Sequence, residues 1–173
     1  MRSHAEKIAY TSLTVCIAMI LSYLETLLPY IPLPGFKPGF ANIATAVALF
    51  CLGLPSAISV SLIRILLSSL LFGSPVSLLF SISGGIFTLV VLIIYRAILN
   101  KYVGFIGLGV LSSAAHCIGQ SIAASALYGV SLLFTYLPWI LLLSIPTGLL
   151  TGAITYTIVS RIKKLRLGAL KSN

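Results

Sequence analysis

Acidic residues are almost missing from this sequence. Only Glu6 and Glu25 occur among 173 residues, against eleven lysines and arginines. Two carboxylates cannot form the paired acidic clusters that hold Mg²⁺ on a diphosphate, because a hard cation needs several oxygen ligands. Chemistry that depends on such clusters is therefore excluded from this chain, and we expect no metal site.

Nucleotide-binding and common catalytic motifs are also absent. The dipeptide Gly-Lys never occurs, so the chain has no P-loop of its own, and no H-E-x-x-H, G-x-S-x-G or C-x-x-C pattern occurs. The cysteines Cys16, Cys51 and Cys117 fall inside apolar segments and support neither a disulfide framework nor a zinc site. We expect a binding or transport protein without a cofactor in this chain, and no enzyme.

What the sequence does contain is long uncharged segments. Hydrophobic residues make up 59% and charged residues 8%, whereas an ordinary soluble domain has about 25% charged residues. Residues 65–95 and 102–160 contain no Lys, Arg, Asp or Glu, and a helix that crosses a bilayer needs about 20 mostly apolar residues. The composition predicts one all-α integral membrane domain over residues 1–173, with the lipid bilayer around it.

Proline and glycine residues divide the chain into six expected spans. Pro29, Pro32 and Pro34 end the first span, Pro55 follows the second, and Gly73-Ser74-Pro75 forms a tight turn after the third. The expected single compact bundle has six transmembrane helices at about 8–28, 40–54, 56–72, 76–99, 104–128 and 132–160.

The basic residues predict the orientation of this bundle. With six spans, nine of the eleven basic residues lie on one side: Arg2, Lys7, Arg96, Lys101, Arg161, Lys163, Lys164, Arg166 and Lys171. The positive-inside rule makes that side the cytoplasm. We therefore expect a multi-pass protein of the cell membrane with both termini in the cytoplasm. A net charge of +9 would suggest nucleic acid for a soluble protein, but the membrane interpretation accounts for it here.

Polar residues inside the expected spans gather in the middle and outer half of the bundle. Arg64 is central in the third span, and a guanidinium keeps its charge, which is costly at bilayer depth. Its expected neighbours are Glu25, Asn42, His116 and Gln120, with Lys37 in the outer first loop. Such convergence predicts an outward-facing pocket with a net positive charge.

We hypothesise that Arg64 and Lys37 receive an anionic group such as a carboxylate or a phosphate. His116, Gln120 and Asn42 are expected to supply neutral hydrogen bonds. The expected substrate-binding residues also include apolar or ring-stacking walls: Tyr23, Tyr136 and Trp139.

Each polar residue also has a structural alternative. Arg64 and Glu25 could form an ion pair that only holds the bundle together. His116 and Gln120 could join helices by hydrogen bonds, and Asn42 could cap its own helix.

Small residues recur every fourth position in the first span, at Thr14, Ala18 and Ser22. Such spacing lets membrane helices approach closely. It predicts either packing within this bundle or docking to another membrane protein.

Three motifs carry a resemblance to a known family: P-G-x-K-x-G-x-A-N at 34–42, S-L-x-R at 61–64 and A-H-x-x-G-Q at 115–120. With them the sequence resembles the bacterial Gx transporter family, whose members are often labelled heptaprenyl diphosphate synthase component I. The family is similar to the S components of energy-coupling factor (ECF) transporters. An Ala-x-x-x-Ala motif often docks S components, but here its literal match, Ala5 and Ala9, lies at the cytoplasmic edge.

The resemblance implies an S-component-like protein that binds a small, anionic, vitamin-like, flavin-related or isoprenoid-precursor compound. It also implies a T component and two ATPase subunits as partners, with ATP used by those ATPases. The alternatives are a membrane accessory subunit of a prenyl diphosphate synthase and a stand-alone secondary carrier. Glu25 or His116 would be the group for proton coupling in such a carrier.

Overall fold

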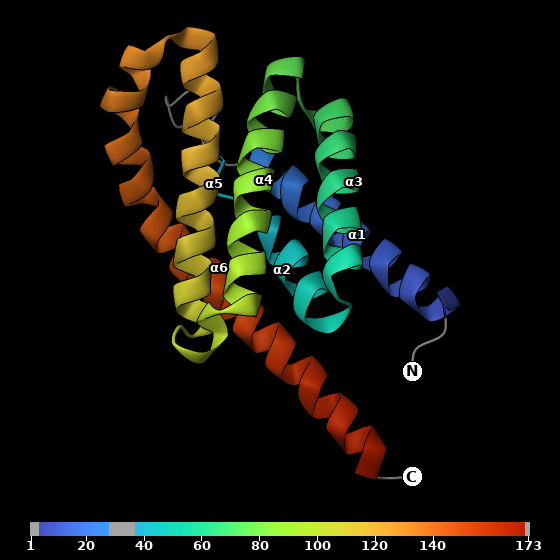
Figure 1. Cartoon of the computed structure of the whole chain (residues 1–173). Helices are drawn as coiled ribbons and strands as arrows, with labels where there is room; N and C mark the ends of the chain where they lie inside the picture. The colour runs from blue at the N-terminus through green and yellow to red at the C-terminus, as the bar shows by residue number, and fades with distance from the viewer. Residues whose placement is uncertain (1–3, 28–36, 172–173) are drawn as a thin grey trace.

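A computed structural model describes residues 4–27 and 37–171. The described residues form an all-helical protein with six α-helices and one short 3₁₀ helix (Figure 1). The elements are α1 (His4–Thr26), α2 (Asn42–Cys51), α3 (Leu54–Phe72), α4 (Pro75–Ala97), η1 (Leu99–Lys101), α5 (Phe105–Tyr128) and α6 (Val130–Lys171).

Five helices are long and apolar enough to cross a membrane: α1, α3, α4, α5 and the segment Leu137–Leu165 of α6. The chain is therefore a multi-pass membrane protein. The expected second span, 40–54, is wrong as a full crossing, because α2 has only 10 residues. At a rise of 1.5 Å per residue it is about 15 Å long, roughly half of the hydrocarbon core.

The other expected boundaries agree with the structure to within a few residues, except at the end of the chain. The turn between α3 and α4 has Ser74 as N-cap, whose Oγ accepts a hydrogen bond from the Ser77 N–H at 3.2 Å, and Pro75 begins α4. A proline fits a first helical turn because its missing N–H has no helical partner there. Helix α6 continues well past the expected residue 160, to Lys171.

Both termini lie at the same end of the bundle (Figure 1). The connections from α2 to α3 and from α4 to α5 lie at that end too, which we call the terminal end. The turns between α3 and α4 and between α5 and α6 lie at the opposite end, the turn end. Helix α2 runs toward the terminal end. The number of passages between the two ends is therefore even, as the six-span expectation requires.

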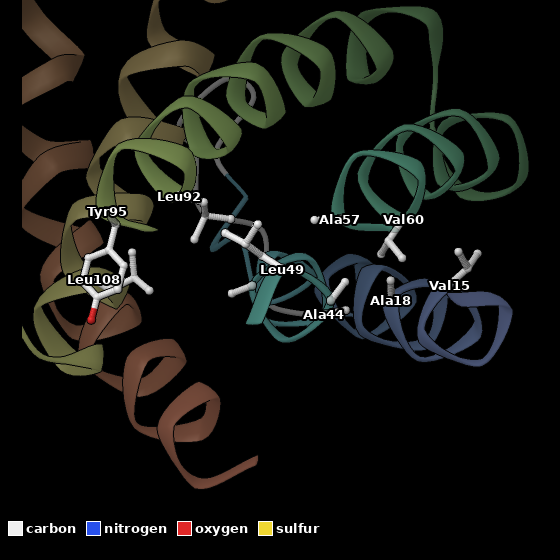
Figure 2. Packing of buried hydrophobic residues seen from close by; sticks show 11 residues of the cluster. Val15, Ala18, Ala44, Leu49, Ala57, Val60, Leu92, Tyr95 and Leu108 are labelled. Carbon is white, nitrogen blue, oxygen red and sulfur yellow. The ribbon is translucent and has the colours of Figure 1, made fainter. Parts of the chain in front are cut away.

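The hydrophobic core fills the terminal end of the bundle. Figure 2 shows Ala18 of α1 beside Val60 of α3, and Leu49 of α2 near Leu92 of α4. Tyr95 packs edge-on against the Phe50 ring, with 5.8 Å between the ring centroids. This apolar packing closes the bundle at the terminal end, so that space for a ligand remains toward the turn end.

Helices α5 and α6 pack through glycines that leave no room for a side chain. A Cβ atom on Gly109 would meet the backbone of Gly148 and Gly152, and one on Gly148 would lie 2.5 Å from the Cα of Val110. The small residues at 148 and 152 therefore pack within this chain. Close backbone approach of this kind stabilises helix pairs in lipid, where water cannot drive them together.

Candidate functional site

A cavity of about 490 Å³ opens at the turn end of the bundle. Its rim residues Thr26, Phe72 and Ser74 are exposed, and its inner wall includes Arg64 and His116, both buried. Four helices, the turn between α3 and α4, and the described segment before α2 (residues 37–41) contribute to it. The lining residues are Ser22, Glu25, Thr26, Lys37, Arg64, Ser68, Phe72, Gly73, Ser74, Ser77, Ser81 and His116.

Arg64 lies at the bottom of this cavity with 4% of its surface exposed. Its Nη2 donates a hydrogen bond to Oδ1 of Asn42 at 3.3 Å, while its Nε has no hydrogen-bond partner. Within the described residues Arg64 forms no ion pair with Glu25, so the structural ion pair considered above is not present. An always-charged side chain is thus held in place by a neutral amide and keeps donor capacity unused.

Lys37 lies on the cavity wall formed by α4. Its Nζ donates hydrogen bonds to Oγ of Ser77 at 2.6 Å and to Oγ of Ser81 at 3.1 Å. Burial lowers the pKa of Lys37, nearby Arg64 lowers it further, and Glu25 opposes the shift. The two serines, which the sequence analysis missed, could have been found from their i, i+4 spacing on α4.

Glu25 faces the same cavity from α1. One oxygen, Oε1, accepts a hydrogen bond from the backbone N–H of Ala41 at 3.3 Å, directly before the first residue of α2. A carboxylate is favourable at a helix N-terminus because it meets unpaired N–H groups and the positive end of the helix dipole. Glu25 therefore anchors the start of α2 while remaining part of the cavity lining.

His116 packs against glycine backbone on two sides. A Cβ atom on Gly84 would lie 2.6 Å from its Cε1, and one on Gly39 would lie 3.5 Å from its Cδ2. Its Nδ1 is 3.3 Å from Oγ1 of Thr88, with the tautomer deciding which atom donates. The two glycines provide the slot that places the imidazole at the cavity wall.

Gln120 and Asn42 lie behind the cavity lining. Oε1 of Gln120 accepts a hydrogen bond from the backbone N–H of Lys37 at 3.4 Å, and Asn42 accepts the bond from Arg64. Irregular backbone inside a membrane protein needs such partners. Both residues thus support the segment before α2 and Arg64, and neither lines the cavity.

Two of the three aromatic residues expected as walls, Tyr23 and Trp139, do not line the cavity. Tyr23 is 45% exposed, and its ring packs on Phe72 with 5.1 Å between centroids, so Phe72 is the aromatic residue at the rim. Trp139 is 63% exposed on α6 and lies outside the cavity lining. The side chain of Tyr136 is outside the described part of the chain.

The three small residues of α1 divide between different surroundings. Ala18 is fully buried, and it packs beside Val60, so it is not available to a docking partner. Ser22 is also buried and lines the cavity, whereas Thr14 lines a groove. Packing within the bundle, the alternative considered above, accounts for Ala18, while docking to another membrane protein stays a prediction.

That groove, of about 530 Å³, runs between α1, α2 and the second half of α6. Its walls are mainly aliphatic and include Leu13, Ile17, Val47, Ile154 and Ile158. It lies on the outside of the bundle and is separate from the polar cavity.

The heptaprenyl diphosphate synthase component I family model matches residues 14–158. The chain belongs to this family. The matched residues include every lining residue of the polar cavity and most lining residues of the groove. No curated protein and no solved structure matches the chain. Among the described residues, no three His, Cys, Asp or Glu side chains group as metal ligands.

Proposed function

We propose that this protein is the substrate-binding S component of an ECF-type uptake transporter for a small anionic compound. The observation that carries the proposal is the cavity itself, in which Arg64 and Lys37 face the same space with Glu25 as the only acid. Arg64 and Lys37 bind the anionic group. His116 contributes a hydrogen bond from the cavity wall. Asn42 holds the Arg64 side chain in place, and Gln120 holds the backbone of Lys37.

The proposed orientation places the cavity toward the outside of the cell. Basic residues flank the terminal end, including Lys7, Arg96, Lys101 and Arg161, and positive residues favour the cytoplasmic side. Both termini are then cytoplasmic. The turn end faces outward, where it receives substrate from the medium.

Energy for uptake comes from partners in this proposal. The sequence has no P-loop, so ATP hydrolysis belongs to two ATPase subunits that act through a membrane T component. The aliphatic groove between α1, α2 and α6 offers the T component an apolar surface. Of the three small residues Thr14, Ala18 and Ser22 on α1, Thr14 lines this groove.

The family description supports a second candidate, a membrane accessory subunit of a heptaprenyl diphosphate synthase. Prenyl transfer ionises an allylic diphosphate that acidic clusters hold through Mg²⁺, and this chain has two acids in total. In that role the chain would serve another subunit and perform no transfer itself.

Purification of the tagged chain from its own cells, followed by identification of co-purified proteins, tests the proposal. We expect a membrane T component and two ATPases, and ATP-dependent substrate uptake after reconstitution of the complex in liposomes. Recovery of a soluble prenyl synthase would support the accessory role. Uptake by the chain alone, driven by an ion gradient, would establish a secondary carrier and overturn the S-component proposal.

A further inference from the structure

We infer that the compound bound in the cavity is amphoteric: an acid that also carries an amino group or another N–H donor. This inference rests on the proposed function and specifies the chemical class of its substrate. It comes from the way in which the three charged side chains of the cavity are kept apart.

Each of these charged groups is held by a neutral partner. Lys37 binds two serine hydroxyls of α4, Arg64 binds Asn42, and Glu25 binds the backbone N–H of Ala41. Although Lys37 and Arg64 line the same cavity as Glu25, no ion pair between either cation and Glu25 is present in the described chain. Glu25 acts electrostatically on both cations without direct contact. Direct contact would offset more of the cost of burial, and a lysine stem is long enough to turn toward a carboxylate. Since the protein holds the opposite charges apart, a ligand with groups of both kinds compensates them best.

The cavity has two donors without partners. Nε of Arg64 and Oγ of Ser22 make no hydrogen bond, although the two residues are 4% and 6% exposed. Buried polar atoms normally have partners, so each exception needs an explanation. Both residues line the cavity, and oxygens of a carboxylate or phosphate would satisfy these donors.

The acidic side has acceptors without partners. An ionised carboxylate accepts about four hydrogen bonds, whereas Glu25 accepts bonds from the backbone N–H groups of Ala41 and Phe40 at the start of α2. Anchoring α2 accounts for these two bonds and leaves about two acceptor sites for a ligand in the cavity that Glu25 lines. An N–H donor on the ligand, best a protonated amine, would use them.

The remaining wall offers hydroxyl groups to a ligand. Hydroxyl groups line much of the cavity, at Ser22, Thr26, Ser68, Ser74, Ser77 and Ser81. Phe72 is the single Phe, Tyr or Trp among the described lining residues. Most of these hydroxyls have partners within the protein, but Ser22 Oγ has none. A long isoprenoid chain would leave Ser22 Oγ without a partner, whereas a compact polar acid would bind it.

The test uses the full-length chain in detergent, incubated with the total small-molecule extract of the cells that contain it. Compounds that stay bound through gel filtration are identified by native mass spectrometry. Three variants are compared: Glu25→Gln, Arg64→Gln and, as the matched control, Glu6→Gln. Gln at position 25 can still accept the Ala41 N–H, so this variant removes the charge and keeps the anchor of α2.

We expect the wild-type protein to retain a compound that contains both an acidic group and an N–H donor. Retention should fall about tenfold or more in Glu25→Gln, as expected for loss of a hydrogen bond to a charged group. Glu6→Gln should retain the compound, because Glu6 lies outside the cavity lining.

The outcomes separate the inference from the proposed function. A retained anion without an N–H donor, lost in Arg64→Gln but kept in Glu25→Gln, would overturn the inference and leave the S-component proposal standing. Absence of any retained compound on the wild-type protein would overturn both. If Glu25→Gln does not fold, the composition of the compound on the wild-type protein still decides.

Discussion

Lys37 and Ser77 are joined by a hydrogen bond of 2.6 Å between Nζ and Oγ. This bond connects the segment before α2 to α4, two elements forty positions apart in the sequence. Together with the bond from the Lys37 N–H to Gln120, it fixes the non-helical entry to α2 against α4 and α5. The ammonium group is therefore held at the cavity wall in advance, and a bound anion need not order it.

The pH dependence of anion binding should follow Lys37. Burial lowers the pKa of Lys37 in the ligand-free protein. As the pH rises, Lys37 therefore loses its positive charge at a lower pH than an ordinary lysine does. Affinity should fall as the pH rises through that lowered value. Lys37→Arg should bind with little change over the same range, since arginine does not titrate there.

Binding titrations of both proteins across this alkaline range provide the measurement. An equal decline in Lys37→Arg would assign the pH dependence to another group. Folding stability should respond in the opposite direction: the unfolded chain binds the proton more tightly, so the contribution of Lys37 to the free energy of unfolding rises with pH in the same window.

Replacement of Arg64 by leucine should abolish ligand binding while the protein still folds in detergent. The variant removes the buried cation and leaves the amide oxygen of Asn42 without its hydrogen bond. This loss should lower the free energy of unfolding by about 1–3 kcal/mol. Binding assays and gel filtration on the same sample separate loss of function from loss of structure. Lys101→Gln, at the terminal end, is the control for loss of one positive charge, and full binding by the leucine variant would contradict the role of Arg64.

Gly39→Ala should impair the site through its backbone. Gly39 has φ +80°, and an added Cβ would lie 2.9 Å from Nδ2 of Asn42, the partner of Arg64. Gly129→Ala is the matched control, because Gly129 has φ +102° with no atom within 4 Å of the added Cβ. Both variants incur left-handed backbone strain of about 1 kcal/mol. Only Gly39→Ala is expected to weaken binding, and equal affinity of the two variants would show that the Asn42 contact is unimportant.

The sequence was sufficient for the helices and for the cationic residues, because hydropathy and proline punctuation act locally. It did not reveal that residues 40–54 include only a ten-residue helix, since a half-length apolar helix and a short span have the same composition. It also could not distinguish Gln120, which supports the loop, from Lys37, which lines the cavity. That difference depends on how the entry to α2 lies against α5, which is a tertiary contact.

The α5–α6 packing should be sensitive to one methyl group. Gly109→Ala would force the helices apart, since the new Cβ meets backbone atoms of Gly148 and Gly152, which cannot rotate away. Overpacking of this kind costs about 1–3 kcal/mol and should lower the thermal unfolding midpoint in detergent. Gly104→Ala, with nothing within 4 Å of the added Cβ, should leave the midpoint nearly unchanged. A similar midpoint for both variants would mean that the helices separate at little cost.

The proposed orientation can be tested with single cysteines at the two ends of the bundle. Tyr128→Cys lies at the end of α5 beside the turn to α6, and Asn100→Cys lies in η1 at the terminal end; both native side chains are exposed. In a background without Cys16, Cys51 and Cys117, a membrane-impermeant maleimide added to intact cells should label position 128 and not position 100. Permeabilised cells should show labelling at both positions, which controls for access. Labelling of position 100 alone in intact cells would mean that the cavity faces the cytoplasm. A protein in that orientation could not collect substrate from the medium.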